Sequence, residues 1–146
     1  AIVSTESNLL EGKRENARRI AQLAKEAGME GILITQEGGG HADVDLMLTV
    51  DACEAAGIPT VMLTNEIAGP EGTLPPLTAV SQRADAVVTT GNNDELIHLP
   101  AMDRALGGTS VCAGAHEATE AFETSLGILY TATNQLGASR MTSKYM

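Results

Sequence analysis

Short runs of apolar and β-branched residues recur along the chain, and longer mixed segments separate them. The runs are continuous and do not alternate between apolar and polar residues, which is typical of strands covered on both faces of a sheet. They predict four strands, near residues 2–5, 31–35, 60–64 and 86–90.

Two of the intervening segments carry the apolar spacing of an amphipathic helix. Residues 12–27 combine an apolar stripe of Ile20, Leu23, Ala24 and Ala27 with a basic face of Lys13, Arg14, Arg18, Arg19 and Lys25. Residues 43–56 carry a stripe of Leu46, Met47, Val50 and Cys53. Gly28 and Gly57 follow these segments and are well placed to end the two helices.

Strands that alternate with helices predict parallel βαβ units with right-handed crossovers. We therefore expect an α/β fold, a three-layer Rossmann-like domain with a mostly parallel sheet. Gly and Pro residues predict a long loop over 68–76, and further helices are expected over 94–106 and 115–126. These elements predict a single α/β domain over residues 1–146, in which residues 107–146 form a C-terminal extension.

Composition narrows the classes of partner. The chain has 146 residues and a formal net charge of −10, which argues against binding to nucleic acid or to anionic membranes. It shows no secretory signal and no uncharged stretch of about 18 apolar residues, so we expect a cytoplasmic protein without a membrane span. Its cysteines, Cys53 and Cys112, form no CxxC pair, which argues against a disulfide framework or a zinc site.

Polar residues follow all four predicted strands, in residues 4–8, 35–38, 64–66 and 89–93. The carboxyl ends of parallel strands share one edge of a sheet, and ligands bind outside that edge. The edge would collect the carboxylates of Glu6, Glu37 and Glu66, which can accept hydrogen bonds from an ammonium group. The alternative is that these residues only cap helices and form turns. We expect Glu37, Glu66 and Asn92 to lie in one cleft with the glycines that follow Glu37.

Those glycines, Gly38, Gly39 and Gly40, occupy the position of a phosphate-binding loop, between a strand and a helix. The GxGxxG and GK[ST] patterns are missing, and the carboxylate of Glu37 would repel a phosphate. We expect no nucleotide here. The glycines more simply allow positive φ angles and the close approach of another chain or of a substrate.

His41, Asp43 and Asp45 form an HxDxD pattern at the start of the second predicted helix. Imidazole and carboxylate groups suit several divalent metals. The stronger interpretation is that Asp43 caps the helix and that Asp45 interacts favourably with the positive end of its dipole. We therefore predict no metal.

Four long motifs resemble one known family. They are EGGGHADVDLM (37–47), AGIPTVMLTNEIAGPEG (56–72), RADAVVTTGNNDELIHLPAMDRALGG (83–108) and ATNQLG (132–137). They resemble the pyruvoyl-bearing subunit of component B of glycine, sarcosine and betaine reductases, and more distantly a subunit of D-proline reductase. The chain departs from the family pattern at His41, where Asn is usual, and at a loop with Pro70, Pro75 and Pro76. Both departures bear on substrate choice.

The resemblance implies a subunit of a selenoenzyme complex that reductively cleaves the C–N bond of glycine, sarcosine or betaine. In that family a proprotein cleaves itself before a cysteine, which becomes a pyruvoyl group that holds the substrate amine. A selenocysteine of a partner subunit attacks the α-carbon, and the resulting selenoether leads to acetyl phosphate. The strand-end residues, together with His41, make up the substrate-binding set that we expect, and no catalytic residue is assigned: Glu37, Gly38, Gly39, Gly40, His41, Glu66 and Asn92.

Neither Cys53 nor Cys112 matches the family's precursor cysteine. The pyruvoyl group is therefore expected on an upstream segment outside this chain. The chain itself is then expected to be the carboxyl-terminal part of a longer proprotein, or a relative that has lost the group. The implied partners are the other processing product, a selenocysteine-containing subunit and a small amine, in a hetero-oligomer. The alternative function is a non-catalytic amine-binding or selenoprotein-docking subunit of such a complex.

Overall fold

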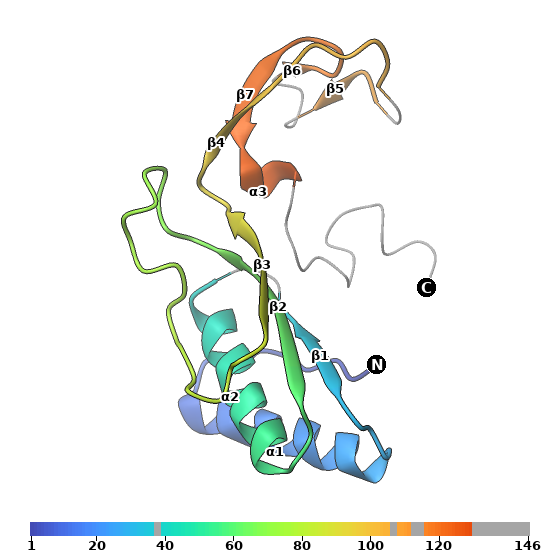
Figure 1. Ribbon diagram of the computed structural model, residues 1–146, viewed down its shortest axis with the longest axis vertical. Coiled ribbons are helices and arrows are strands. Elements are labelled where there is room, and N and C mark those ends of the chain that lie inside the picture. The colour runs from blue at the N-terminus through green and yellow to red at the C-terminus, as the bar shows by residue number, and fades with distance from the viewer. Residues whose placement is uncertain (37–38, 106–107, 112–115, 130–146) are drawn as a thin grey trace.

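A computed structural model of the chain describes residues 1–36, 39–105, 108–111 and 116–129. Two long helices and three strands form its first part, and short antiparallel strands form the rest (Figure 1). The elements are α1 (Leu10–Glu26), β1 (Ile32–Thr35), α2 (His41–Ala55), β2 (Thr60–Glu66), β3 (Val87–Asn92), β4 (Leu96–Leu99), β5 (Ser110–Val111), β6 (His116–Glu117), β7 (Phe122–Ser125) and α3 (Leu126–Leu129). None of the helices in the described part of the chain is long and apolar enough to cross a membrane.

The parallel sheet has the order β1-β2-β3. Ile32 pairs with Thr60 and Met62 pairs with Val87, so the three strands run in the same direction. The predicted strands over 31–35, 60–64 and 86–90 are thus confirmed, as are both amphipathic helices. Helix α2 begins at His41, two residues before the predicted start.

The strand predicted over residues 2–5 is wrong, because this segment is not a strand and is part of none of the sheets that the described residues form. Polar side chains of helix α1 instead contact Thr5 and Glu6, at the end of this segment. The amide of Asn16 donates to the Thr5 carbonyl at 2.9 Å, and Lys13 forms an ion pair with Glu6.

The helices predicted over 94–106 and 115–126 are also wrong. Leu96–Leu99 is a strand that pairs antiparallel with Phe122–Ser125, and His116–Glu117 pairs with Ser110–Val111. Ile97 and Leu99 are less exposed than Leu96 and His98, which is the period of a strand and not of a helix. Pairing between segments distant in sequence therefore decided these elements.

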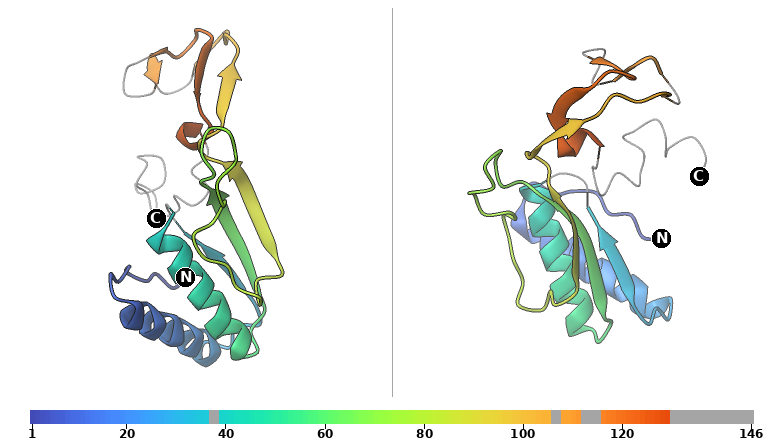
Figure 2. Two further views of the ribbon diagram at one scale, coloured as in Figure 1. Left: turned by 90° about the vertical axis from the view of Figure 1, so that its left-hand side faces the viewer. Right: turned by 45° about the horizontal axis from the view of Figure 1, so that its top comes forward.

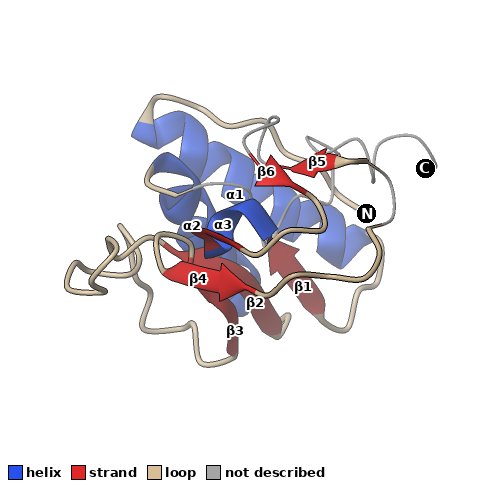
Figure 3. Cartoon of the chain, turned by 90° about the horizontal axis from the view of Figure 1, so that it is seen from above, coloured by secondary structure: helices blue, strands red, loops and turns tan. Residues whose placement is uncertain are grey.

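The core lies between α2 and one face of the parallel sheet. Leu46, Met47 and Val50 of α2 pack with Met62 of β2. Part of the connection between β2 and β3 packs against the same cluster through Leu77, Ala79 and Ala84. Helix α1 packs on α2, and both helices lie on the same side of the sheet (Figures 2 and 3).

The three-layer arrangement is not what the described residues form. Leu33 and Val61, which were expected in a sheet covered on both faces, are 63% and 41% exposed. The structure is an α/β fold whose parallel sheet has helices on one face.

Candidate functional site

The carboxyl ends of β1, β2 and β3 form one polar edge, which we call the strand-end rim and define as Gln36, Asn65, Glu66, Thr90, Asn92 and Asn93. Register brings its members together, because Glu66 of β2 pairs with Asn92 of β3. The backbone N–H of Asn93 also donates to the Glu66 carbonyl at 2.8 Å. Two of the predicted site residues, Glu66 and Asn92, are therefore neighbours.

A buried carboxylate organises the rim from the helix side. Asp43, which is 3% exposed, accepts from the Gln36 amide at 2.7 Å, the Gly40 N–H at 3.1 Å and the Thr78 N–H at 2.8 Å. The same Gln36 nitrogen donates to Thr64 Oγ1 at 2.9 Å. Asp43 thus joins the end of β1, the start of α2 and the loop after β2. Its role is to position these segments, as its predicted capping role suggested.

The described glycines have distinct roles in this corner. Gly40 precedes α2 with φ of 73°, a conformation that residues with a Cβ rarely adopt. A Cβ on Gly39 would lie 2.4 Å from Cδ1 of Ile67, so this glycine permits close packing of the loop on the residue after β2. Glu37 and Gly38 lie outside the described residues, and their part in a shared cleft stays a prediction.

The side chain of Asn92 is held by the chain itself and is not free for a ligand. The Asn92 amide bridges the next loop, since Oδ1 accepts from the Ala68 N–H at 2.9 Å and Nδ2 donates to the Gly69 carbonyl at 2.7 Å. His41 is exposed at the start of α2, and its carbonyl accepts from Lys13. No group of three or more His, Cys, Asp or Glu side chains in the described part of the chain is arranged to hold a metal ion.

The rim also holds buried polar atoms that have no hydrogen-bond partner. Within the described residues there are five such side-chain atoms, and all belong to the rim: Gln36 Oε1, Asn65 Nδ2, Asn65 Oδ1, Thr90 Oγ1 and Asn93 Oδ1. Asn65 is 1% exposed and uses neither end of its amide. Each unsatisfied buried group lowers the stability of the fold by about 1–3 kcal/mol, so the presence of five such atoms at one edge of the sheet needs an explanation. A polar ligand at the rim would supply one.

Sequence reasoning placed these amides at the strand ends but did not select them as site residues. The available signal was an amide residue at the end of an apolar strand, directly beside an acidic or amide residue that was selected. Carboxylates were preferred as site candidates because their charge suits an ammonium group. Burial without a partner, which distinguishes Asn65 from Asn92, depends on the packing of three strands.

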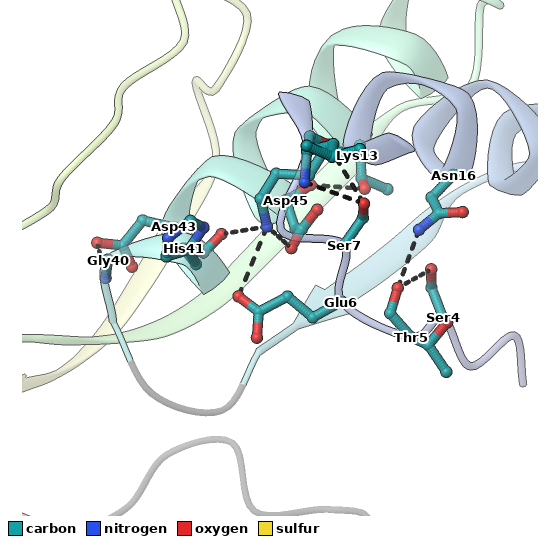
Figure 4. Close-up of polar contacts among 12 residues, drawn as sticks. Ser4, Thr5, Glu6, Ser7, Lys13, Asn16, Gly40, His41, Asp43 and Asp45 are labelled. Atoms are coloured by element: carbon teal, nitrogen blue, oxygen red, sulfur yellow. Dashed lines mark hydrogen bonds and ion pairs between the residues drawn. The ribbon is translucent and has the colours of Figure 1, made fainter. Parts of the chain in front are cut away.

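A cavity of about 530 Å³ lies beside the rim, between residues 1–6, α1 and β1. At its polar end Lys13 is 3% exposed and contacts Asp45 Oδ2 at 2.5 Å, the His41 carbonyl at 3.1 Å and Glu6 Oε1 at 3.5 Å (Figure 4). Glu6, the first of the predicted carboxylates, is therefore engaged by a lysine. Gln36 borders this cavity, but Glu66 and Asn92 do not.

Comparison with known proteins gives a consistent result. The family model for glycine/sarcosine/betaine reductase component B subunits matches residues 1–144. The betaine reductase complex component B subunit alpha of Peptoclostridium acidaminophilum is 40% identical over 106 residues, which cover 73% of this chain and 24% of that protein. The glycine reductase complex component B subunits alpha and beta of Acetoanaerobium sticklandii are 33% identical over 152 residues, covering 98% of this chain and 35% of that protein.

A third relative, the sarcosine reductase complex component B subunit alpha of Peptoclostridium acidaminophilum, is 28% identical over 99% of this chain and 35% of its own length. The chain thus spans 24–35% of the length of these curated relatives. No solved structure matches the chain.

Proposed function

The chain belongs to the family of glycine/sarcosine/betaine reductase component B subunits, and on that premise we propose that it forms part of an enzyme complex that reductively cleaves the C–N bond of a small amine of the glycine, sarcosine or betaine type. Its part in that complex is to bind and orient the amine at the strand-end rim. Relatives named as components of glycine, betaine and sarcosine reductase complexes support this proposal.

The observation that carries the proposal is the set of unpartnered polar atoms at the rim. An amino acid of the glycine type offers an ammonium donor and a carboxylate acceptor. Asn65 can meet both, because its Oδ1 accepts from an ammonium N–H and its Nδ2 donates to a carboxylate. The oxygens of Gln36, Thr90 and Asn93 add further partners for a cation. Such charge-assisted bonds are stronger than neutral ones.

The described residues do not fit the pyruvoyl group that the family implies. Cys53 lies inside α2 with an exposure of 0%, so it does not match a processed chain terminus. A pyruvoyl group on other polypeptide of the complex and a selenocysteine-containing partner remain predictions. The role proposed for this chain is restricted to binding and orienting the substrate.

The test is the variant Asn65→Ala in the assembled complex. Loss of a hydrogen bond to a charged group is worth about 1.5–3 kcal/mol, which corresponds to roughly a 10- to 150-fold increase in KM. Asn16→Ala is the matched control, because this half-buried asparagine donates to the Thr5 carbonyl, away from the rim, and its loss should leave KM unchanged. Steady-state kinetics with glycine, sarcosine and betaine give the values.

Stability provides the second readout for Asn65. Since its amide has no partner among the described residues, Asn65→Ala should cost only the packing of the deleted atoms. A KM within twofold of the parent in a folded variant would contradict the proposal. So would a loss of more than about 3 kcal/mol of unfolding free energy, because it exceeds the cost of one hydrogen bond and would indicate a structural network.

The burial of Cys53 also favours the binding-only function as a second candidate, since the one cysteine in the described residues is inaccessible. Titration calorimetry of this chain with each amine separates the two functions. Binding of an amine by a chain whose removal leaves turnover in the complex unchanged would support the non-catalytic function.

A further inference from the structure

One face of the parallel sheet carries a row of exposed apolar side chains across all three strands. Leu33 of β1, Val61 of β2 and Val88 of β3 are 63%, 41% and 55% exposed. Leu33 pairs with Val61, and Val88 pairs with Leu63, two residues after Val61. Paired residues of neighbouring strands, and residues two apart along a strand, project from the same face. We call Leu33, Val61, Leu63 and Val88 the open face.

The topology explains why none of the helices among the described residues covers the open face. The strand order β1-β2-β3 means that both connections advance in the same direction across the sheet. Right-handed crossovers that advance in one direction lie on one face. Helix α2 makes the first connection, and residues 67–86 make the second and pack on the α2 core. Both helices lie on that side in Figures 2 and 3.

An uncovered face of this kind is unusual for a parallel sheet. Parallel strands are almost always buried on both faces, and their usual cover is a layer of helices. Apolar side chains gathered on an exposed surface mark an interaction site. The three exposed members come from three different strands, so they form a continuous surface and not scattered single residues.

We infer that the open face is an internal interface of component B, covered by the apolar side of helices from the part of the component B polypeptide that this chain does not span. Relatives in the family are about three to four times as long as the matched region, so they contain polypeptide that could form such a layer. A helical occupant is favoured over a second copy of this chain, because parallel sheets pack against helices. This inference rests on the family and not on substrate binding at the rim.

The test compares adjacent residues of one strand. Val87 pairs with Met62 on the helix side and is 47% exposed, whereas Val88 lies on the open face and is 55% exposed. Val87→Cys and Val88→Cys are made separately in a Cys112→Ser background. Component B is purified intact from cells that make each variant, and labelling by a maleimide is followed by mass spectrometry of the peptide that carries the position. The same measurement is made on the 146-residue chain by itself.

We expect the thiol at position 88 to react at least tenfold more slowly than the thiol at position 87 in component B, and at a similar rate in the chain alone. Rates within twofold of each other in component B would overturn the inference. Protection of position 88 in the chain alone that grows with protein concentration would also overturn it, because it would identify a second copy as the occupant. Neither result depends on substrate binding, so the experiment can disprove this inference without bearing on the proposed function, and the reverse.

Discussion

At the scale of single residues, Lys13 is the clearest departure from the sequence pattern. Its position on the basic face of α1 predicted an exposed side chain, yet the structure leaves it 3% exposed. Asp45 from α2 and Glu6 from the N-terminal segment converge on its ammonium group, and the His41 carbonyl provides a third partner. A buried lysine is tolerated because its charge is paired and its donors are used.

Lys13→Met is expected to lower the free energy of unfolding by about 1.5–3 kcal/mol, because it removes charged hydrogen bonds and leaves Asp45 without its partner. Arg19→Met is the matched control on the same helix. Arg19 is 73% exposed and pairs with Glu15 at the surface, so its loss should change stability by less than about 1 kcal/mol. Urea unfolding of both variants measures the difference, and equal effects would show that Lys13 makes only a surface ion pair.

At the scale of elements, the periodic pattern of α2 predicted its buried face correctly but not its first residue. The predicted stripe of Leu46, Met47, Val50 and Cys53 is the buried face of the helix. Its start differs from the prediction, because Asp43 accepts from the Gly40 N–H in the first turn and is not itself the residue before the helix. The last member of the stripe, Cys53, has a thiol whose pKa is raised by burial and, to a lesser extent, by Glu54.

The raised pKa of Cys53 predicts how stability depends on pH. The thiol stays protonated in the folded state to a higher pH than in the unfolded state, where it ionises near pH 8.5. Its contribution is fully present below that pH and is lost as the pH rises toward the folded pKa. Stability should therefore fall above about pH 8.5, by up to about 1.4 kcal/mol per pH unit. Unfolding midpoints from pH 7.5 to 9.5 should fall less steeply in Cys53→Ala. Equal dependence of the midpoint on pH in the parent and in Cys53→Ala would show that the Cys53 thiol does not cause the loss of stability.

At the scale of the whole molecule, the described chain contains two kinds of structure. The first is α1, α2 and the parallel sheet, where the core of Leu46, Met47, Val50 and Met62 lies. The second is a set of short antiparallel pairs, β4 with β7 and β5 with β6 (Figure 1). Phe122 stacks on His116 in this part, with ring centroids 4.7 Å apart. α3 packs against both β3 and β7.

This division predicts unequal protection of backbone amides. Amides of α2 and β2 should exchange with solvent only when the whole chain unfolds, because they surround the core. Amides of β4 and β7 should exchange through a smaller opening, since Phe122 and Thr124 are the buried side chains of that pair. Native-state hydrogen exchange across a urea series resolves the two. A common free energy of exchange for both sets would show that the chain unfolds as a single unit.

Local sequence patterns determined much of the first part of the chain. Continuous apolar runs predicted β1, β2 and β3, and helical spacing predicted α1 and α2, because each signal depends on residues within one element. The polar strand endings also placed Glu66 and Asn92 at one edge, since parallel strands end together. The family resemblance, carried by motifs read directly from the sequence, agrees with the family model over residues 1–144.

Tertiary structure alone decided the remaining features. The antiparallel pairing of 96–99 with 122–125 joins segments about 25 residues apart, and no local period predicts such a partner. Whether Lys13 is exposed depends on Asp45 and Glu6 arriving from other segments. The presence or absence of partners for the rim amides also depends on tertiary structure, because the loop after β2 forms hydrogen bonds with Asn92 and not with Asn65. The open face has the same cause, because the direction in which crossovers advance across a sheet is a property of strand order and not of any single strand.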